Sequence, residues 1–577
     1  MDARPVVCDN VNTKIDRKES VVSEKKTQPN IILILADDLG FSDISCFGSE
    51  IQTPNLDRLA GRGLRFSSMY NGARCCPARA SLLTGLHPHQ AGVAHMTMDL
   101  GIPGYRGFLR PDCVTIAEVL KDSGYRTLMS GKWHVGGNYS PFDRESWKRT
   151  AGDDSHPTPV QRGFDRFYGI LNGVASFYDP MLLMDQETFI RAEAPDFYLT
   201  DTITDHAVEM MRESPADTSG EKPYFLYLSY TAPHWPLHAF DEDIALYEGK
   251  YRKGWDAVRT ARHENLKGMK ILDEKWDISP RDVDAPPWED MPNKDWEDIR
   301  MAAFAAQIHR MDQGIGRVLE EVRNRREEEN TLIMFLSDNG GCAEFLLEDP
   351  GDAGPSIWGD KTRDGRPMRI GNIPGLKPGP EDTYMSYDLP WTNVSNAPFR
   401  LFKHWVHEGG IATPFIVSWP NQIKQSEILH EPLQLVDITA TLINAAGAYY
   451  PKEKNGAPIP ECEGESFLPL LQGQRFGKQK PLYFEHEGNR AIRDGRWKLV
   501  SEHGKGWELY DMVEDRTELS DVAAKDAARV ARMTGMYEAW AKRCGVLPWP
   551  PKKNEMNLSV RGEHIHLHYH CNRKFLP

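Results

Sequence analysis

The chain has 577 residues, with 69 Lys and Arg against 84 Asp and Glu, which gives a formal net charge of −15. This acidic balance argues against a non-specific nucleic-acid binder, and no apolar run approaches the roughly 20 residues of a membrane helix. The odd and sparse count of nine cysteines argues against a disulfide scaffold. A large, soluble, globular enzyme is the remaining expectation.

Residues 1–29 are polar and charged and contain few large apolar side chains, so we expect a flexible amino-terminal arm. This stretch also lacks the apolar h-region of a signal peptide, which favours a cytoplasmic location. A true start upstream of Met1 would instead make the protein periplasmic or secreted.

Strands and helices alternate through residues 30–448. Short apolar or aromatic runs predict strands at 31–35, 125–129, 224–230, 331–336 and 414–419. Helical patterns cover 54–63, 76–85, 114–121, 299–323 and 435–446. This alternation predicts a catalytic α/β domain built on a doubly wound, mostly parallel sheet. Two segments rich in charge, Gly or Pro, 241–298 and 342–396, are predicted to be loops at the mouth of a site.

The carboxy-terminal part has a different character. Residues 449–477 are rich in Pro and Gly and are predicted to form a linker. Strands at 481–485, 491–492 and 497–500 and a helix at 526–543 predict a small α+β domain over 478–577. Four histidines alternate in its tail, at His564, His566, His568 and His570. On a strand they would share one face and could bind a transition metal; a polar edge strand or a loose tail is the alternative.

Oxygen-bearing side chains follow two of the predicted strands. Asp37 and Asp38 come after the first strand, and Asp338 and Asn339 come after the strand at 331–336. The carboxyl ends of parallel strands meet at one edge of a sheet, so these four side chains are expected to lie together. Such hard ligands fit Ca²⁺, with Mg²⁺ as the alternative. Each motif alone would also suit a turn.

A short segment after these carboxylates points to a family. Cys75-Cys76-Pro77-Ala78-Arg79, continuing to Gly85, resembles the C-x-P-x-R signature of the formylglycine-dependent sulfatases, which have an alkaline-phosphatase-like fold. The resemblance implies that a maturase converts Cys75 to formylglycine. A buried cysteine pair that caps a helix would explain neither the Pro nor the Arg spacing.

Further segments resemble the family between about residues 30 and 519. They are Gly131-Lys132-Trp133-His134, Pro233-His234-Trp235-Pro236, Phe399–Lys403 with Glu408-Gly409-Gly410, and the carboxy-terminal Arg496–Leu499 and Trp507–Asp511. The resemblance implies a hydrated aldehyde at Cys75 that attacks sulfur, with His134 as the base that later releases sulfate. It implies that His234 and Lys403 contact sulfate and protonate the leaving oxygen, and that Arg79 and Lys132 hold the aldehyde. Asp37, Asp38, Asp338 and Asn339 would hold the metal.

The expected reaction is hydrolysis of sulfate monoesters, with aryl sulfates and sulfated carbohydrates as substrates. Two alternatives remain open at this stage. Phosphonate monoester and phosphate diester hydrolases of the same superfamily share the metal set and the aldehyde. An unmatured protein would instead bind sulfated ligands without turnover. Specificity is expected to lie in the loops at 96–110, 138–165, 172–196 and 342–396.

Overall fold

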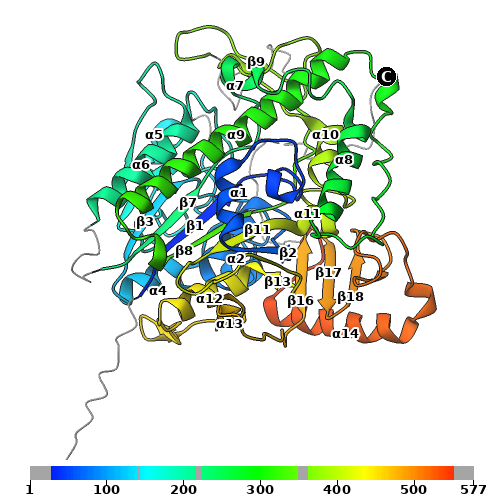
Figure 1. Ribbon diagram of the computed structural model, residues 1–577. Coiled ribbons are helices and arrows are strands. Elements are labelled where there is room, and N and C mark those ends of the chain that lie inside the picture. Colours follow the sequence, from blue (N-terminus) through cyan, green and yellow to red (C-terminus); the bar gives the residue numbers. More distant parts are fainter. Residues whose placement is uncertain (1–27, 141–142, 215–221, 349–360, 552–577) are drawn as a thin grey trace, which may run out of the picture.

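A large mixed sheet forms the centre of the molecule (Figure 1). The computed structural model describes residues 28–140, 143–214, 222–348 and 361–551. The sheet runs in the order β12-β2-β11-β8-β1-β7-β3-β4-β5-β6, and β13 also pairs with β2. Its strands are β1 (Asn30–Ala36), β2 (Leu64–Tyr70), β3 (Arg126–Gly131), β4 (Arg166–Ile170), β5 (Leu183–Asp185), β6 (Thr188–Phe189), β7 (Tyr224–Ser229), β8 (Thr331–Ser337), β11 (Ala412–Ser418), β12 (Glu427–Leu429) and β13 (Leu433–Gln434).

The middle of this sheet is parallel, as predicted. Strands β8, β1, β7, β3 and β4 pair in parallel, while β11 is antiparallel to both β8 and β2. All seven residues of β1 are buried, which is the pattern of a central strand covered on both faces. The mostly parallel α/β fold is therefore confirmed. Strand β2 was not predicted, because Arg and Ser interrupt its apolar residues.

Helices cover both faces of the sheet. Ile32 and Ile34 pack with α1 (Pro54–Gly61), α6 (Leu199–Glu213) and α9 (Lys294–Asn324). Ile31 and Leu33 pack on the opposite side with α2 (Cys75–Thr84), α4 (Ile116–Asp122) and α12 (Leu435–Ala445). Successive side chains of a strand point to opposite faces of the sheet and therefore pack in two separate cores. Shorter helices are α3 (Pro88–Ala91), α5 (Arg144–Thr150), α11 (Glu408–Ile411) and α13 (Leu468–Leu471), with 3₁₀ turns η1 (Ser45–Phe47), η2 (Trp288–Asp290), η3 (Glu328–Asn330) and η4 (Ala523–Lys525).

The prediction that 241–298 is a loop was wrong. This segment holds α7 (Asp241–Ala245), α8 (Trp255–Gly268) and the first turn of α9. The buried face of α8 includes Arg259 and Arg262, whose charge hides the helical periodicity in the sequence. Arg262 is fully buried because Asp43 and Glu50 neutralise it, with Nη1 2.6 Å from Asp43 Oδ1 and Nη2 2.8 Å from Glu50 Oε1.

The described part of 342–396 is largely irregular, as expected. It holds only the short strands β9 (Arg369–Ile370) and β10 (Thr383–Tyr384) and the helix α10 (Asp388–Ser395). Residues 449–477 contain the hairpin β14 (Glu453–Lys454) and β15 (Ala457–Pro458) and the helix α13, and Phe467 and Leu471 join the core beneath α12.

A second sheet follows near the carboxy terminus (Figure 1). It is an antiparallel meander of β16 (Leu482–His486), β17 (Asn489–Asp494), β18 (Trp497–Ser501) and β19 (Glu508–Asp511), covered by α14 (Ala527–Cys544). Met533, Tyr537 and Trp540 of α14 pack on Ile492 and Leu499, which confirms a smaller α+β unit. The histidines of the tail lie outside the described residues. In the described part of the chain, every helix is too short or too polar to cross a bilayer.

Candidate functional site

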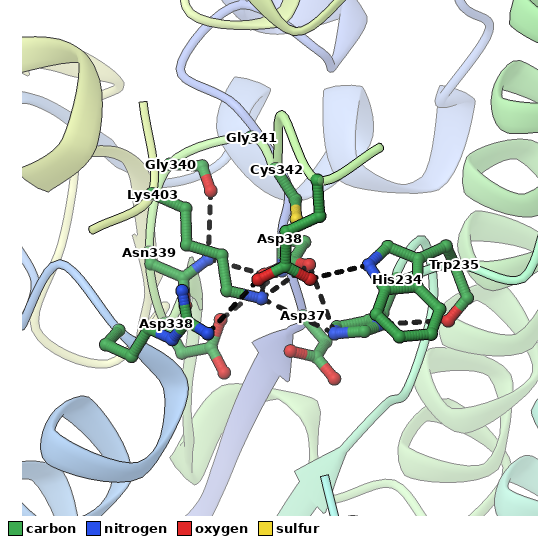
Figure 2. A network of polar contacts seen from close by, with 12 residues as sticks. Asp37, Asp38, His234, Trp235, Asp338, Asn339, Gly340, Gly341, Cys342 and Lys403 are labelled. Atoms are coloured by element: carbon green, nitrogen blue, oxygen red, sulfur yellow. Dashed lines mark hydrogen bonds and ion pairs between the residues drawn. The ribbon is translucent and has the colours of Figure 1, made fainter. Parts of the chain in front are cut away.

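The four predicted metal ligands lie at the carboxyl edge of the central sheet (Figure 2). β1 and β8 are parallel neighbours with Ala36 opposite Ser337, so the residues that follow them meet. Asp37, Asp38, Asp338 and Asn339 are all buried. The chain turns sharply after β1, where Asp38 has a φ of 65°, and the Asp38 amide donates to Asp338 Oδ1 at 3.3 Å.

Two buried cations, Lys132 and Arg79, pair with Asp37 and Asp338. Lys132, directly after β3, places Nζ 2.6 Å from Asp37 Oδ2. Arg79, on α2, donates from Nε and Nη2 to Asp338 Oδ2 at 2.9 and 2.7 Å. Arg79 Nη1 also donates to the Lys132 carbonyl at 2.9 Å. The guanidinium therefore links α2 with the ends of β3 and β8.

Burial outweighs these ion pairs at two of the carboxylates. Burial raises the pKa of Asp37 to about 6, against the opposing influence of Lys132 and Arg79. Burial, joined by the neighbouring Asp37, raises the pKa of Asp338 to about 7. Among the described residues, Asp37 Oδ1 and Asn339 Oδ1 are buried without a hydrogen-bond partner. Unpartnered hard oxygens in a buried acidic site fit a divalent cation.

Asp38 belongs to a second group of contacts, formed with His234 and Lys403 (Figure 2). Lys403 Nζ lies 2.8 Å from Asp38 Oδ1, and His234 Nε2 lies 3.3 Å from Asp38 Oδ2. Burial would raise the pKa of Asp38, but His234 and Lys403 outweigh it and lower the pKa to about 2. Asn339 Nδ2 also donates to Asp38 Oδ1 at 2.6 Å.

The His234 ring has a defined orientation. Its Nδ1 lies 2.7 Å from the carbonyl oxygen of Trp235, so this nitrogen carries the proton of the neutral ring. Nε2 lies 3.4 Å from Lys403 Nζ, from which a neutral ring accepts, and 3.3 Å from Asp38 Oδ2, to which only a protonated ring donates. Burial lowers the pKa of His234 to about 4, which is consistent with a neutral imidazole.

Cys75 is the first residue of α2, and all ten residues of this helix are buried. Its neighbour Cys76 places Sγ 3.2 Å from His134 Nε2, and burial lowers the pKa of His134 to about 4. His134 has a φ of 57°. Gly173 makes room for the ring, since a Cβ at this position would stand 2.4 Å from His134 Nε2. Cys75 is close enough to Asp37 and Asp38 for its charge to raise the pKa of both.

The structure thus brings all ten predicted residues to one edge of the sheet, although their roles stay predictions. Sequence reasoning missed several neighbours. Ser229, the last residue of β7, hydrogen-bonds Arg79. Glu344 lies at the rim, where Trp235 Nε1 donates to it at 2.9 Å and Arg74 pairs with it at 3.1 Å. Arg74 directly precedes Cys75 and could have been noticed for this reason, whereas nothing in the sequence around Glu344 signals its position.

The order of these motifs along the chain matches known proteins. Residues 29–448 match the family model described as Sulfatase, and residues 399–537 match the model described as N-sulphoglucosamine sulphohydrolase, C-terminal. The chain belongs to the sulfatase family. This sulfatase is accordingly a sulfuric ester hydrolase, and the match over most of the chain confirms the family predicted from the Cys75 segment.

Relatives of this sulfatase span nearly its whole length. The arylsulfatase of Klebsiella aerogenes is 33% identical over 484 residues, which cover 79% of this chain and 95% of the relative. An uncharacterized sulfatase of Schizosaccharomyces pombe is 30% identical over 542 residues, which cover 86% and 90%. A solved structure in complex with its substrate D-glucosamine-2-N,6-O-disulfate has a TM-score of 0.58 and 21% identity, covering 90% of this chain and 98% of that chain. This last likeness shows the fold alone.

Proposed function

We propose that this sulfatase hydrolyses aryl sulfates and sulfated carbohydrates with Cys75, converted to formylglycine by a maturase, as its nucleophile. The observation that carries the proposal is the position of Cys75, buried at the start of α2 beside interlocked lysine, arginine and carboxylate side chains. The arylsulfatase relative supports aryl sulfates, and the disulfated glucosamine bound by the structural neighbour supports sulfated carbohydrates. A hydrated formylglycine supplies a hydroxyl nucleophile.

Asp37, Asp38, Asp338 and Asn339 would hold a divalent cation, for which we propose Ca²⁺, with Mg²⁺ as the alternative. Their oxygens form a hard donor set, and two of them, Asp37 Oδ1 and Asn339 Oδ1, have no hydrogen-bond partner among the described residues. The bound cation would supply Lewis-acid polarisation at the reacting centre. Lys132, Arg79 and Lys403 pair with the three carboxylates and partly neutralise the acidic group.

Lys403 is the group we assign as proton donor to the leaving oxygen. It is buried and carries three N–H donors, while His234 Nε2 beside it is an acceptor. His234 would therefore orient Lys403 and accept a hydrogen bond. This division refines the expectation that either residue protonates the leaving group.

His134 is the group we assign as base. Its Nε2 faces the Cys76 thiol beside Cys75, and its Nδ1 has no hydrogen-bond partner among the described residues. A neutral ring in this position can accept a proton close to residue 75. Arg79 and Lys132, held by Asp338 and Asp37, contribute fixed positive charge against the developing negative charge on the substrate.

The test begins with residue 75. We expect Cys75→Ala to abolish turnover of 4-nitrophenyl sulfate while the melting temperature stays within a few degrees of the wild type. Cys75→Ser should also fail, except in a host whose maturase accepts serine. Mass spectrometry of the wild-type peptide that contains residue 75 should show an aldehyde in place of the thiol.

Two results would contradict the proposal. Turnover retained by Cys75→Ala would remove residue 75 from the reaction. Unmodified thiol throughout a fully active wild-type preparation would exclude the formylglycine. A comparison of an aryl sulfate with an aryl phosphonate on the same preparation separates the sulfatase from a phosphonate monoester hydrolase, and we expect the sulfate to have the higher kcat/KM.

A further inference from the structure

A cluster of polar groups lies where the carboxy-terminal sheet meets the site. The tight turn between β16 and β17 joins His486 to Asn489, which face each other across the ladder, and Glu487 and Gly488 form its two central residues. His404 comes from the large domain, directly after Lys403. The ligand atoms of His404, His486 and Glu487 all lie within 4.8 Å of one another.

The cluster adjoins the segment that leads into Cys75. The His404 amide donates to the carbonyl oxygen of Ala73 at 2.7 Å, two residues before Cys75. Burial lowers the pKa of His486 well below its usual range, and the charges of Arg74 and Cys75 are close enough to influence it. The turn of the small domain therefore reaches the side of the site that faces the start of α2.

The backbone conformation of this turn is strained at Glu487. Glu487 has a φ of 48° and Gly488 a φ of 85°. A two-residue turn with two positive φ angles favours Asn or Asp followed by Gly, so Gly488 suits its position and Glu487 does not. His404 also has a positive φ, of 90°. Bulky residues held in this region point to a function that offsets the strain.

Hydrogen bonds of Asn489 set the tautomer of His404, whose ring pairs with the Glu487 carboxylate. Asn489 Oδ1 accepts from the His503 amide at 3.0 Å, and Asn489 Nδ2 donates to the His486 carbonyl at 3.1 Å, so the amide has one orientation. The same Nδ2 lies 3.2 Å from His404 Nε2. His404 Nε2 is therefore the acceptor, and Nδ1 carries the proton that faces Glu487 Oε2 at 3.4 Å.

This tautomer argues against a metal ion. A histidine that ligates a metal through Nδ1 needs a lone pair on this atom and normally donates from the other nitrogen. Here the Asn489 amide donates to Nε2, so Nδ1 has no lone pair to offer. The cluster presents an acceptor instead, the Glu487 carboxylate, whose side chain is 24% exposed, whereas the His486 ring beside it is fully buried.

We infer that Glu487, oriented by His404 and Asn489, is a specificity-determining residue that accepts hydrogen bonds from the hydroxyl groups of a sulfated saccharide. This inference rests on the proposed function and narrows its substrate class. A plain aryl group offers no donors, and packing it against a partly buried carboxylate would be unfavourable. A polyhydroxylated leaving group satisfies the carboxylate, so Glu487 favours saccharides over aryl groups.

The test compares Glu487→Gln and Glu487→Asn with the wild type on 4-nitrophenyl sulfate and on a panel of monosaccharide 6-O-sulfates. The quantity measured is the ratio of kcat/KM for the saccharide to kcat/KM for the aryl sulfate. We expect both variants to lower this ratio about tenfold or more, the usual effect of losing a hydrogen bond to a charged group. Asn suits the turn, so Glu487→Asn should melt no lower than the wild type. Glu538→Gln, on the exposed side of α14, is the matched control.

A binding measurement keeps the inference testable without turnover. In a Cys75→Ala background, Glu487→Asn should weaken binding of the saccharide sulfate about tenfold in calorimetry. Ratios and affinities within about twofold of the parent would overturn the inference, as would a wild type that neither turns over nor binds any saccharide sulfate of the panel. Tight Zn²⁺ binding that His486→Ala abolishes would make the cluster a metal site. Failure of the proposed function itself would give a different result: the wild type would release no sulfate from 4-nitrophenyl sulfate.

Discussion

Three cations, Lys132, Arg79 and Lys403, pair with the three carboxylates of the site, and Arg79 contacts both Asp338 and Asp37, so positive and negative side chains are equal in number. A divalent cation would therefore leave the pocket with a net charge of about +2 at the point where the sulfate ester binds. Bulk charge is a poor guide to such a site. The protein carries −15 overall, and local charge outweighs this at short range because distant surface charges are screened by salt.

Gly173 leads to a prediction at the residue scale. An alanine methyl group would stand 2.4 Å from His134 Nε2 and would push the ring away from residue 75. Since a displacement of about 1 Å can cost about 100-fold in rate, we expect Gly173→Ala to lower kcat at least tenfold. Steady-state kinetics with 4-nitrophenyl sulfate measure this.

The control for this substitution is Gly506→Ala, where an added Cβ meets nothing within 4 Å. Its kcat should equal that of the wild type. Both variants should melt within a few degrees of the parent. Wild-type kcat in Gly173→Ala would show that the position of His134 does not limit the reaction.

The residues of the site could be predicted from the sequence far better than their surroundings. Asp37, Cys75 and Lys403 occur in short motifs whose spacing is visible in one dimension. Glu344 and Glu487 have no such motif, because only the folding of the loop after β8 and the docking of the small domain bring them near the site. Helix α8 was missed for a similar reason. An arginine in the sequence suggests an exposed position, but Arg262 is buried because it pairs with Asp43 and Glu50.

At the scale of elements, His238 ties the segment after β7 to β10 and to the loop after β4. Its Nε2 donates to the Thr383 carbonyl oxygen at 2.6 Å, and its Nδ1 accepts from the Phe177 amide at 3.2 Å. These contacts require a neutral imidazole. Burial lowers the pKa of His238 to about 4, below the value of about 6.5 in an unfolded chain.

The pH dependence of stability follows from this difference. Between about pH 6.5 and pH 4 the unfolded chain binds a proton at His238 that the folded protein does not, so stability falls as the pH falls through this window. His238→Gln removes the group. We expect the wild type to lose up to about 3 kcal/mol more stability than the variant across the window, seen as a steeper fall of the melting temperature.

The exposed His503 supplies the comparison for this measurement. His503→Gln should reproduce the pH profile of the wild type. If the profiles of His238→Gln and the wild type run parallel from pH 7 to pH 4, then His238 is not the group that couples these elements to pH.

At the scale of the whole molecule, a buried ionic network joins the two sheets. Lys498 of β18 places Nζ 2.9 Å from Glu408 Oε1 of α11 and 2.8 Å from Glu518 Oε1. Arg516 Nε lies 3.2 Å from Glu408 Oε2. Burial would raise the pKa of Glu408, but Lys498 and Arg516 outweigh it and lower the pKa. The network therefore depends on every member remaining charged.

Removal of one member should be costly. Lys498→Met leaves two buried carboxylates without their shared cation, and we expect it to destabilise the protein by about 3–5 kcal/mol. Denaturant unfolding followed by tryptophan fluorescence measures this. Lys148→Met breaks only an exposed pair with Glu145 and should cost less than about 1 kcal/mol. Equal effects of the two substitutions would mean that the network contributes nothing beyond a surface pair.

The complete burial of α2 bears on how the active enzyme is made. Cys75 is only 2% exposed once the sheet and its helices have assembled, so another protein has no access to its sulfur in the finished fold. We therefore expect the proposed conversion to formylglycine to take place on the nascent, still unfolded chain. The outcome is then fixed for the lifetime of each molecule, and a preparation would consist of two populations that do not interconvert, one competent and one permanently inert.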